Sequence, residues 1–255
     1  MTAVVLALIG ASPGLLGSLM GVGGGIIVVP ALSELYGVPF REAVAVSLVV
    51  IVANSSASAA AYVARGASDL KVGVVLELAT VSGAILGSSV AGFAPVTTLK
   101  LLFAAVAIYS AASLWLRRHG TSEAQIVGAY EVKAWGPGLA VSVAAGALSG
   151  LLGIGGGVFK VPVMTLAMGV PFKVAAATSN FMIGVTAAAG AYVYWGRGEV
   201  NAELAAPVVV GTFLGARLGS SLLAKLPAKR LQVAFAGLLV VLGGRMAWTV
   251  LSVPQ

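Results

Sequence analysis

Two glycine clusters are the residues of this 255-residue chain whose pattern most clearly suggests chemistry. Both GVGGG at 21–25 and GIGGG at 153–157 lie inside strongly apolar stretches. Glycine in a helix interior costs about 1 kcal/mol relative to alanine, so the clusters predict a break between two helices. The start of the second helix would present free N–H groups, which attract anions. We therefore predict anion binding by the backbone of Gly21, Gly23, Gly24, Gly25, Gly153, Gly155, Gly156 and Gly157.

A lone lysine follows the second cluster. Lys160 lies three residues after Gly157, in the predicted first turn of the second helix. A charged side chain at membrane depth is costly and is a functional candidate by default. We predict that Lys160 supplies the positive charge of the site, although its long stem also allows it to reach a membrane interface.

The helix that follows each cluster carries polar residues. Ser47, Asn54 and Ser58 are spaced by seven and four positions, so they share one helix face. The corresponding region of the second half contains ATSN at 177–180. These side chains can hydrogen-bond an oxyanion, or they can join helices to one another. The predicted substrate contacts are Ser47, Asn54, Thr178, Ser179 and Asn180.

Two further charged residues interrupt apolar runs. Glu77 could carry a coupling proton, and Arg217 could pair with Glu77 or with an anionic substrate. Both residues lie nearer the ends than the centres of their predicted helices. A side chain that extends to the interface is therefore the favoured interpretation for each.

The composition excludes several classes of protein. Hydrophobic residues make up 59% of the chain and charged residues 9%, against about 25% charged residues in soluble domains. This composition predicts an integral membrane protein built from helices, which satisfy their own backbone in lipid. With no cysteine and one histidine, His119, we expect no metal site, no cofactor and no enzymatic activity. No basic soluble domain is present that would bind nucleic acid.

The chain matches itself without a gap at an offset of 132 residues. GVPF at 37–40 recurs at 169–172, and GAILGSS at 83–89 matches GARLGSS at 215–221. The latter glycines are typical of close helix packing. The offset predicts two homologous membrane repeats, 1–116 and 134–255, joined by a polar linker at 117–133.

Each repeat is predicted to be all-α. It begins with a long apolar segment, 2–36 or 134–169, that would reach about 50 Å as one helix and exceed the hydrocarbon core of about 30 Å. The glycine cluster divides this segment into two pieces. Three helices then follow in each repeat, near 42–64, 72–94 and 98–116 and near 173–196, 203–224 and 228–251.

Loop charges predict the orientation by the positive-inside rule. With Lys160 and Arg217 set aside, 13 of the 15 Lys and Arg residues remain. If each long segment crosses once, the charges divide seven to six; if each turns back, they divide nine to four. The second pattern predicts an inverted repeat in a multi-pass protein, with extracytoplasmic termini and a cytoplasmic 117–133 linker. It leaves open whether the broken segments are re-entrant hairpins or two short spans.

The glycine motifs carry a family resemblance. GVGGGIIVVPAL and GIGGGVFKVPVM, each followed by GVPF, and AAATSNFMIG after the second, resemble the TauE/SafE sulfite exporter family, also called the 4-toluene sulfonate uptake permease family. The resemblance covers nearly the whole chain. It implies transport of sulfite, sulfonates or related small organic anions across the bacterial inner membrane.

Together these patterns predict a secondary transporter of such an anion, with export as the favoured direction, working by alternating access in the lipid bilayer. Since no ATPase motif is present, a proton or sodium gradient is expected to drive transport. A homo-oligomer is compatible with the sequence. An anion channel and a non-transporting membrane scaffold are the alternative hypotheses.

Overall fold

The computed structural model describes residues 3–116, 130–222 and 228–252, so most of the predicted linker lies outside the described residues. The described chain is all-helical, as predicted. The first half contains α1 (Ala3–Met20), α2 (Gly25–Pro30), the π-helical turn η1 (Ala31–Leu35), α3 (Phe40–Ala64), α4 (Leu70–Ala91) and α5 (Val96–Leu116). The second half contains α6 (Trp135–Leu152), α7 (Gly157–Leu166), α8 (Phe172–Gly196), α9 (Ala202–Leu222) and α10 (Ala228–Ser252).

Both long apolar segments break where the glycines predict. Gly23 and Gly24 have φ of 85° and 78°, and Gly155 and Gly156 have φ of 84° and 71°. Residues with a Cβ rarely adopt this left-handed region, which explains the need for glycine. The helical segments after the breaks, 25–35 and 157–166, would be only about 16 Å and 15 Å long at 1.5 Å per residue. Each is therefore about half as long as the hydrocarbon core is thick.

Six of the described helices are long and apolar enough to cross a membrane: α3, α4, α6 and α8 over their full lengths, Val96–Ser113 of α5 and Ala202–Gly219 of α9. Their outward faces carry large hydrophobic side chains, such as Leu78 with 72% and Tyr192 with 80% of its surface exposed. Exposed apolar surface of this extent suits lipid rather than water. The chain is thus a multi-pass membrane protein.

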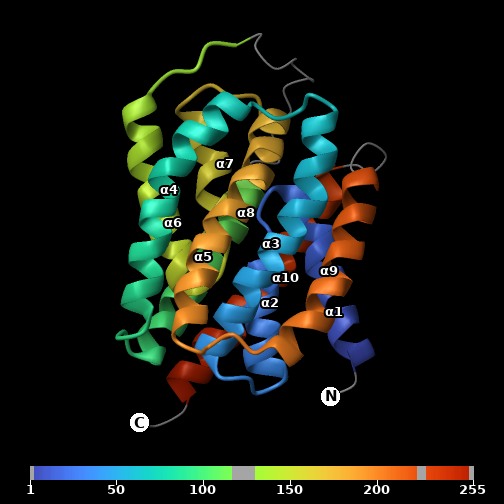
Figure 1. Cartoon of the computed structure of the whole chain (residues 1–255), viewed down its shortest axis with the longest axis vertical. Helices are drawn as coiled ribbons and strands as arrows, with labels where there is room; N and C mark the ends of the chain where they lie inside the picture. Colours follow the sequence, from blue (N-terminus) through green and yellow to red (C-terminus); the bar gives the residue numbers. More distant parts are fainter. Residues whose placement is uncertain (1–2, 117–129, 223–227, 253–255) are drawn as a thin grey trace.

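Helices of the two halves pack against each other in matching pairs. The most extensive contacts join α1 to α9 and α4 to α6, while α3 packs on α8 and α5 on α10. Figure 1 shows α4 and α6 at the left and α1 and α9 at the right, with α3 and α8 between them. The core of the molecule lies in this central layer, where α3 and α8 hold the two broken segments.

Small residues allow the helices of the two flanking pairs, α1 with α9 and α4 with α6, to pack closely, as the GAILGSS and GARLGSS motifs predict. A Cβ on Gly83 would lie 2.1 Å from the carbonyl oxygen of Val143, and one on Gly215 would lie 2.2 Å from that of Ala11. The two contacts differ by 132 positions on both sides, so the same backbone packing occurs twice. Glycine allows these helices to approach at distances that any side chain would prevent.

The first and last helices reach the same end of the molecule. Figure 1 shows the start of α1 and the end of α10 at the lower end of the molecule, and the start of α6 at the upper end. The described part of the linker region, 130–133, therefore lies at the other end of the long axis from the start of α1 and the end of α10.

Candidate functional site

The two glycine turns meet in the buried centre of the molecule. A Cβ on Gly25 would lie 2.2 Å from the carbonyl oxygen of Gly153, and one on Gly157 would lie 2.1 Å from that of Gly21. Residues 21–30 and 152–158 are all buried. The turns therefore face each other, with backbone against backbone and no room for a side chain between them.

One serine from each half binds the glycine turn of the other half. Ser47 Oγ, on α3, donates a hydrogen bond of 2.7 Å to the Gly153 carbonyl. Ser179 Oγ, on α8, donates one of 2.8 Å to the Gly21 carbonyl. The structure thus brings both predicted serines to the glycine turns. Their protons are used there to bind backbone carbonyls, so the serines hold the turns together.

Among the described residues, the first amides of the helices after the turns have no backbone acceptor. Ile27 and Val28 donate to the Gly24 carbonyl, and Phe159 and Lys160 donate to the Gly156 carbonyl. These are the first bonds of each short helix. The amides that precede them, at 25–26 and 157–158, have no acceptor within their own helix.

A tyrosine hydroxyl binds a backbone carbonyl near the end of each helix that leads into a glycine turn. Tyr62 donates a hydrogen bond of 3.0 Å to the Ser18 carbonyl near the end of α1. Tyr194 donates one of 3.1 Å to the Gly150 carbonyl near the end of α6. Both hydrogen bonds satisfy a carbonyl that lacks a helical donor. Sequence reasoning assigned no role to these tyrosines, although their recurrence at the repeat offset was a visible signal.

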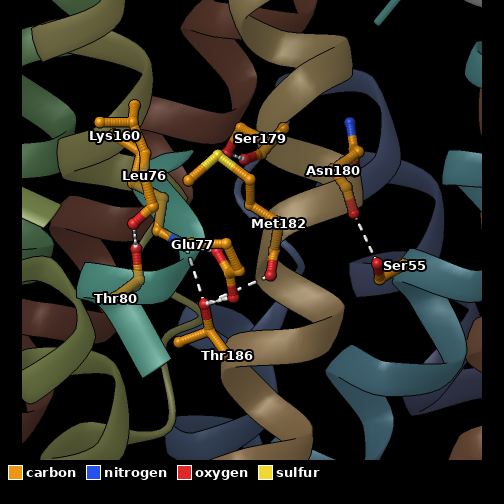
Figure 2. A network of polar contacts seen from close by, with 10 residues as sticks. Ser55, Leu76, Glu77, Thr80, Lys160, Ser179, Asn180, Met182 and Thr186 are labelled. Carbon is orange, nitrogen blue, oxygen red and sulfur yellow. Dashed lines mark hydrogen bonds and ion pairs between the residues drawn. The ribbon is translucent and has the colours of Figure 1, made fainter. Parts of the chain in front are cut away.

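Lys160 is fully buried at the centre of a polar network between three helices (Figure 2). Its Nζ lies 3.1 Å from Glu77 Oε2 on α4 and donates 2.8 Å to Thr186 Oγ1 on α8. The Thr186 hydroxyl donates a hydrogen bond of 2.5 Å to the other carboxylate oxygen of Glu77. The Lys160 side chain is therefore enclosed by the protein and does not extend to its surface. Its partner in this structure is a carboxylate of the protein itself.

The expectation that Glu77 extends to an interface is wrong. Glu77 is only 6% exposed, because α4 packs on α6 and α8 with this residue facing inward. The Lys160 ammonium compensates the buried charge. The partners of Glu77 in the structure are Lys160 and Thr186. Arg217 is exposed on α9.

Two other predicted substrate contacts are engaged with protein groups. The Asn180 side-chain amide donates a hydrogen bond of 3.1 Å to the Ser18 carbonyl, and its Oδ1 accepts one of 3.2 Å from the Ser58 hydroxyl. Ser55 donates to the Asn180 carbonyl, as Figure 2 also shows. Thr178 accepts a hydrogen bond of 2.9 Å from the Asp69 amide, just before α4. These contacts support the alternative in which such side chains join helices.

Asn54 is different from the other predicted contacts. Its side chain is fully buried, and within the described residues neither amide atom has a hydrogen-bond partner. Asn54 lies on the same α3 face as Ile51, whose Cγ2 would be 3.2 Å from a Cβ on Gly23. Buried polar groups are almost always satisfied, so this amide, one turn of α3 from the residue that contacts the first glycine turn, is a candidate for binding a ligand.

The polar centre contains no arrangement suited to a metal. Among the residues that the structure describes, no three His, Cys, Asp or Glu side chains lie together as ligands would.

Fold and site define a polytopic helical membrane protein with two broken segments that meet at its core. The chain belongs to the family described as Sulfite exporter TauE/SafE, whose model matches residues 6–246. It is therefore a member of a transporter family and not an enzyme.

Similar proteins carry transporter names. The chain is 30% identical over 268 residues to "Probable membrane transporter protein YunE" of Bacillus subtilis, covering 97% of this chain and 98% of that protein. It is 29% identical to "Probable membrane transporter protein MJ0441" of Methanocaldococcus jannaschii, covering 94% and 93%. No solved structure matches the chain significantly.

Proposed function

We propose that the protein is a secondary transporter, and by preference an exporter, of a small sulfur-containing oxyanion or organic anion such as sulfite or a sulfonate. The observation that carries this proposal is the buried amide of Asn54, which has no partner within the described residues and lies one turn of α3 from Ile51, a neighbour of Gly23. Its Nδ2 can donate to an anion oxygen, and the free N–H groups at the helix starts add further donors. Lys160, in the second half, supplies a positive charge for the anion.

We also propose that the repeats 1–116 and 134–255 are inverted relative to one another, with both broken segments forming re-entrant hairpins. Helical segments of about 16 Å and 15 Å are too short to cross the core, which favours a return to the side of entry. The start of α6 lies at the end opposite the start of α1 (Figure 1), as an odd number of crossings in the first repeat requires, and this supports the proposed topology. Inverted repeats with broken helices commonly place a substrate between them, where alternating access operates.

A reporter active only in the cytoplasm tests the proposed orientation. Fused after residue 125, it is expected to be active, because the loops predicted on the same side as the linker carry nine of the 13 basic residues counted. Fused to the C-terminus, it is expected to be silent. Activity at the C-terminus together with silence at residue 125 would reverse the topology.

Asn54→Leu tests the proposed binding site. Leucine removes a buried amide that has no partner, so the ligand-free protein is expected to gain about 1–3 kcal/mol of stability, the usual cost of such a group. Binding of methanesulfonate or sulfite is expected to weaken in the same variant. Thermal unfolding and calorimetric titration of purified protein measure the two effects.

Asn201→Leu serves as the control for Asn54→Leu, because Asn201 already bonds Glu42 at 2.8 Å far from the glycine turns. This change is expected to leave anion binding unaffected. If Asn54→Leu binds the anions as the native protein does, Asn54 is not part of the site. Saturable, rather than linear, uptake into vesicles distinguishes the transporter from a channel, and absence of any ligand response would favour a scaffold.

A further inference from the structure

The two halves differ at the positions of the buried ion pair. At an offset of 132 residues, Lys160 corresponds to Val28, Glu77 to Val209 and Thr186 to Asn54. The charge pair therefore joins the second short helix, α7, to α4 of the first half, and the positions that correspond to it around the first short helix are apolar. Since two valines occupy the matching positions, the fold itself does not require charges there.

The pair is isolated from other charged groups. The helices that pack around it are α4, α6, α7 and α8. Apart from Lys160 and Glu77, their only charged residues are Lys71 and Lys173, which are exposed near the starts of α4 and α8. Thr186 adds a neutral hydroxyl. The charge balance of the buried centre therefore depends on Lys160 and Glu77 alone.

This isolation restricts how an anion can reach Lys160. A carboxylate displaced from the ammonium would remain buried without a counter-charge, which is strongly unfavourable. If Glu77 takes up a proton at the same time, the carboxyl group becomes neutral and the ammonium is paired with the anion. The total charge of the centre is then the same before and after binding.

We propose that Glu77 and Lys160 couple anion transport to protons, with one proton bound by Glu77 for each monoanion bound by Lys160. This inference rests on the proposed anion transport. The Glu77 carboxylate and a proton form the O–H bond of the acid, while the Lys160 ammonium keeps its protons and exchanges the carboxylate for the anion. Thr186 is a positioning residue, because its hydroxyl can donate to the carboxylate and accept from the protonated acid. Proton and anion then move together in an electroneutral transfer, so export by this route is driven by the outward gradient of the anion and not by the proton gradient.

The proposal predicts proton uptake on binding. Purified full-length protein is titrated calorimetrically with methanesulfonate, which does not titrate near neutral pH, in two buffers of different ionisation heat at the same pH. The difference in heat is expected to correspond to about one proton per anion. Measured against pH, the dissociation constant is expected to rise about tenfold per unit where free Glu77 is ionised. A structural ion pair would produce neither effect.

Glu77→Gln separates coupling from binding. The amide cannot exchange a proton, so this variant is expected to bind methanesulfonate without proton uptake and with an affinity that no longer changes with pH. Glu203→Gln, on the exposed start of α9, is the matched control and is expected to retain both signatures. If Glu77→Gln does not fold, the measurements on the native protein decide alone.

The outcomes separate the two proposals. Binding of methanesulfonate without proton uptake by the native protein overturns the coupling and leaves the proposed transport standing. Retained pH dependence in Glu77→Gln also overturns it, since another group would then carry the proton. No heat with methanesulfonate, with other small sulfonates or with sulfite contradicts the transport proposal and the coupling with it.

Discussion

Alanine at position 25 is expected to destabilise the protein by about 3 kcal/mol or more, at the upper end of the cost of overpacking a core. Gly25 has an ordinary helical backbone conformation, so alanine is not disfavoured by its φ. The added methyl group would lie 2.2 Å from the Gly153 carbonyl oxygen and 2.6 Å from Ile51 Cδ1. The carbonyl belongs to the opposite glycine turn and cannot rotate away as a side chain would. The yield of monodisperse protein and the midpoint of thermal unfolding measure the loss.

Two further variants complete this test. Gly157→Ala is expected to behave like Gly25→Ala, because its methyl group would lie 2.1 Å from the Gly21 carbonyl oxygen. Gly196→Ala, at the end of α8, would meet nothing within 4 Å and is expected to be neutral or slightly stabilising. Native stability of both Gly25→Ala and Gly157→Ala would mean that the turns do not meet.

Lys160→Met is expected to have the second large effect. Methionine keeps the stem but leaves Glu77 buried without its ion-pair partner, which typically costs about 3–5 kcal/mol of stability. Anion binding is also expected to weaken by roughly 1.5–3 kcal/mol, the contribution of a charged hydrogen bond, or about tenfold to more than a hundredfold. Chemical or thermal unfolding and calorimetric titration with methanesulfonate measure the two losses separately.

The double variant Lys160→Met with Glu77→Leu distinguishes stability from function. Removing both charges is expected to restore most of the lost stability, because an apolar replacement of a buried ion pair is often neutral or stabilising. The valines at the matching positions 28 and 209 show that this fold accommodates apolar side chains there. Anion binding is expected to stay weak. Full recovery of binding would remove Lys160 from the site.

Local features of the sequence predicted most of the fold. The glycine clusters located both breaks, because a left-handed backbone at several adjacent positions strongly favours glycine. Helix lengths followed from apolar runs bounded by Pro, Gly and charged residues. The observed α3, 40–64, and α8, 172–196, differ from the expected 42–64 and 173–196 by at most two residues. The glycine-rich motifs at 83–89 and 215–221 predicted close packing, although not which helices pack.

The site was harder to predict, because its contacts join distant parts of the chain. Lys160 was identified from its cost in lipid, but its partner Glu77 is 83 residues away and has no counterpart in the repeat that would reveal it. Ser47 and Ser179 were predicted as substrate contacts, and the structure shows them bonded to carbonyls of the glycine turns. Their bonds to the opposite turn depend on how the two halves pack together. The spacing of residues within one helix does not predict that packing. Asn180 and Thr178 lie beside Ser179 in sequence but face other helices.

The reciprocal serine bonds impose an order of events on biosynthesis. Ser47 is made 106 residues before the glycine whose carbonyl it binds, and Gly21 is made 158 residues before the serine that binds its carbonyl. A ribosome therefore delivers the first glycine-broken segment to the membrane before the residues of the second half that bind it have been made. The nascent half must keep these polar backbone groups hydrated, or shielded by the insertion machinery, until the second half emerges. Assembly of the core is consequently completed late in synthesis, and a chain stopped at the linker would be a substrate for membrane quality control.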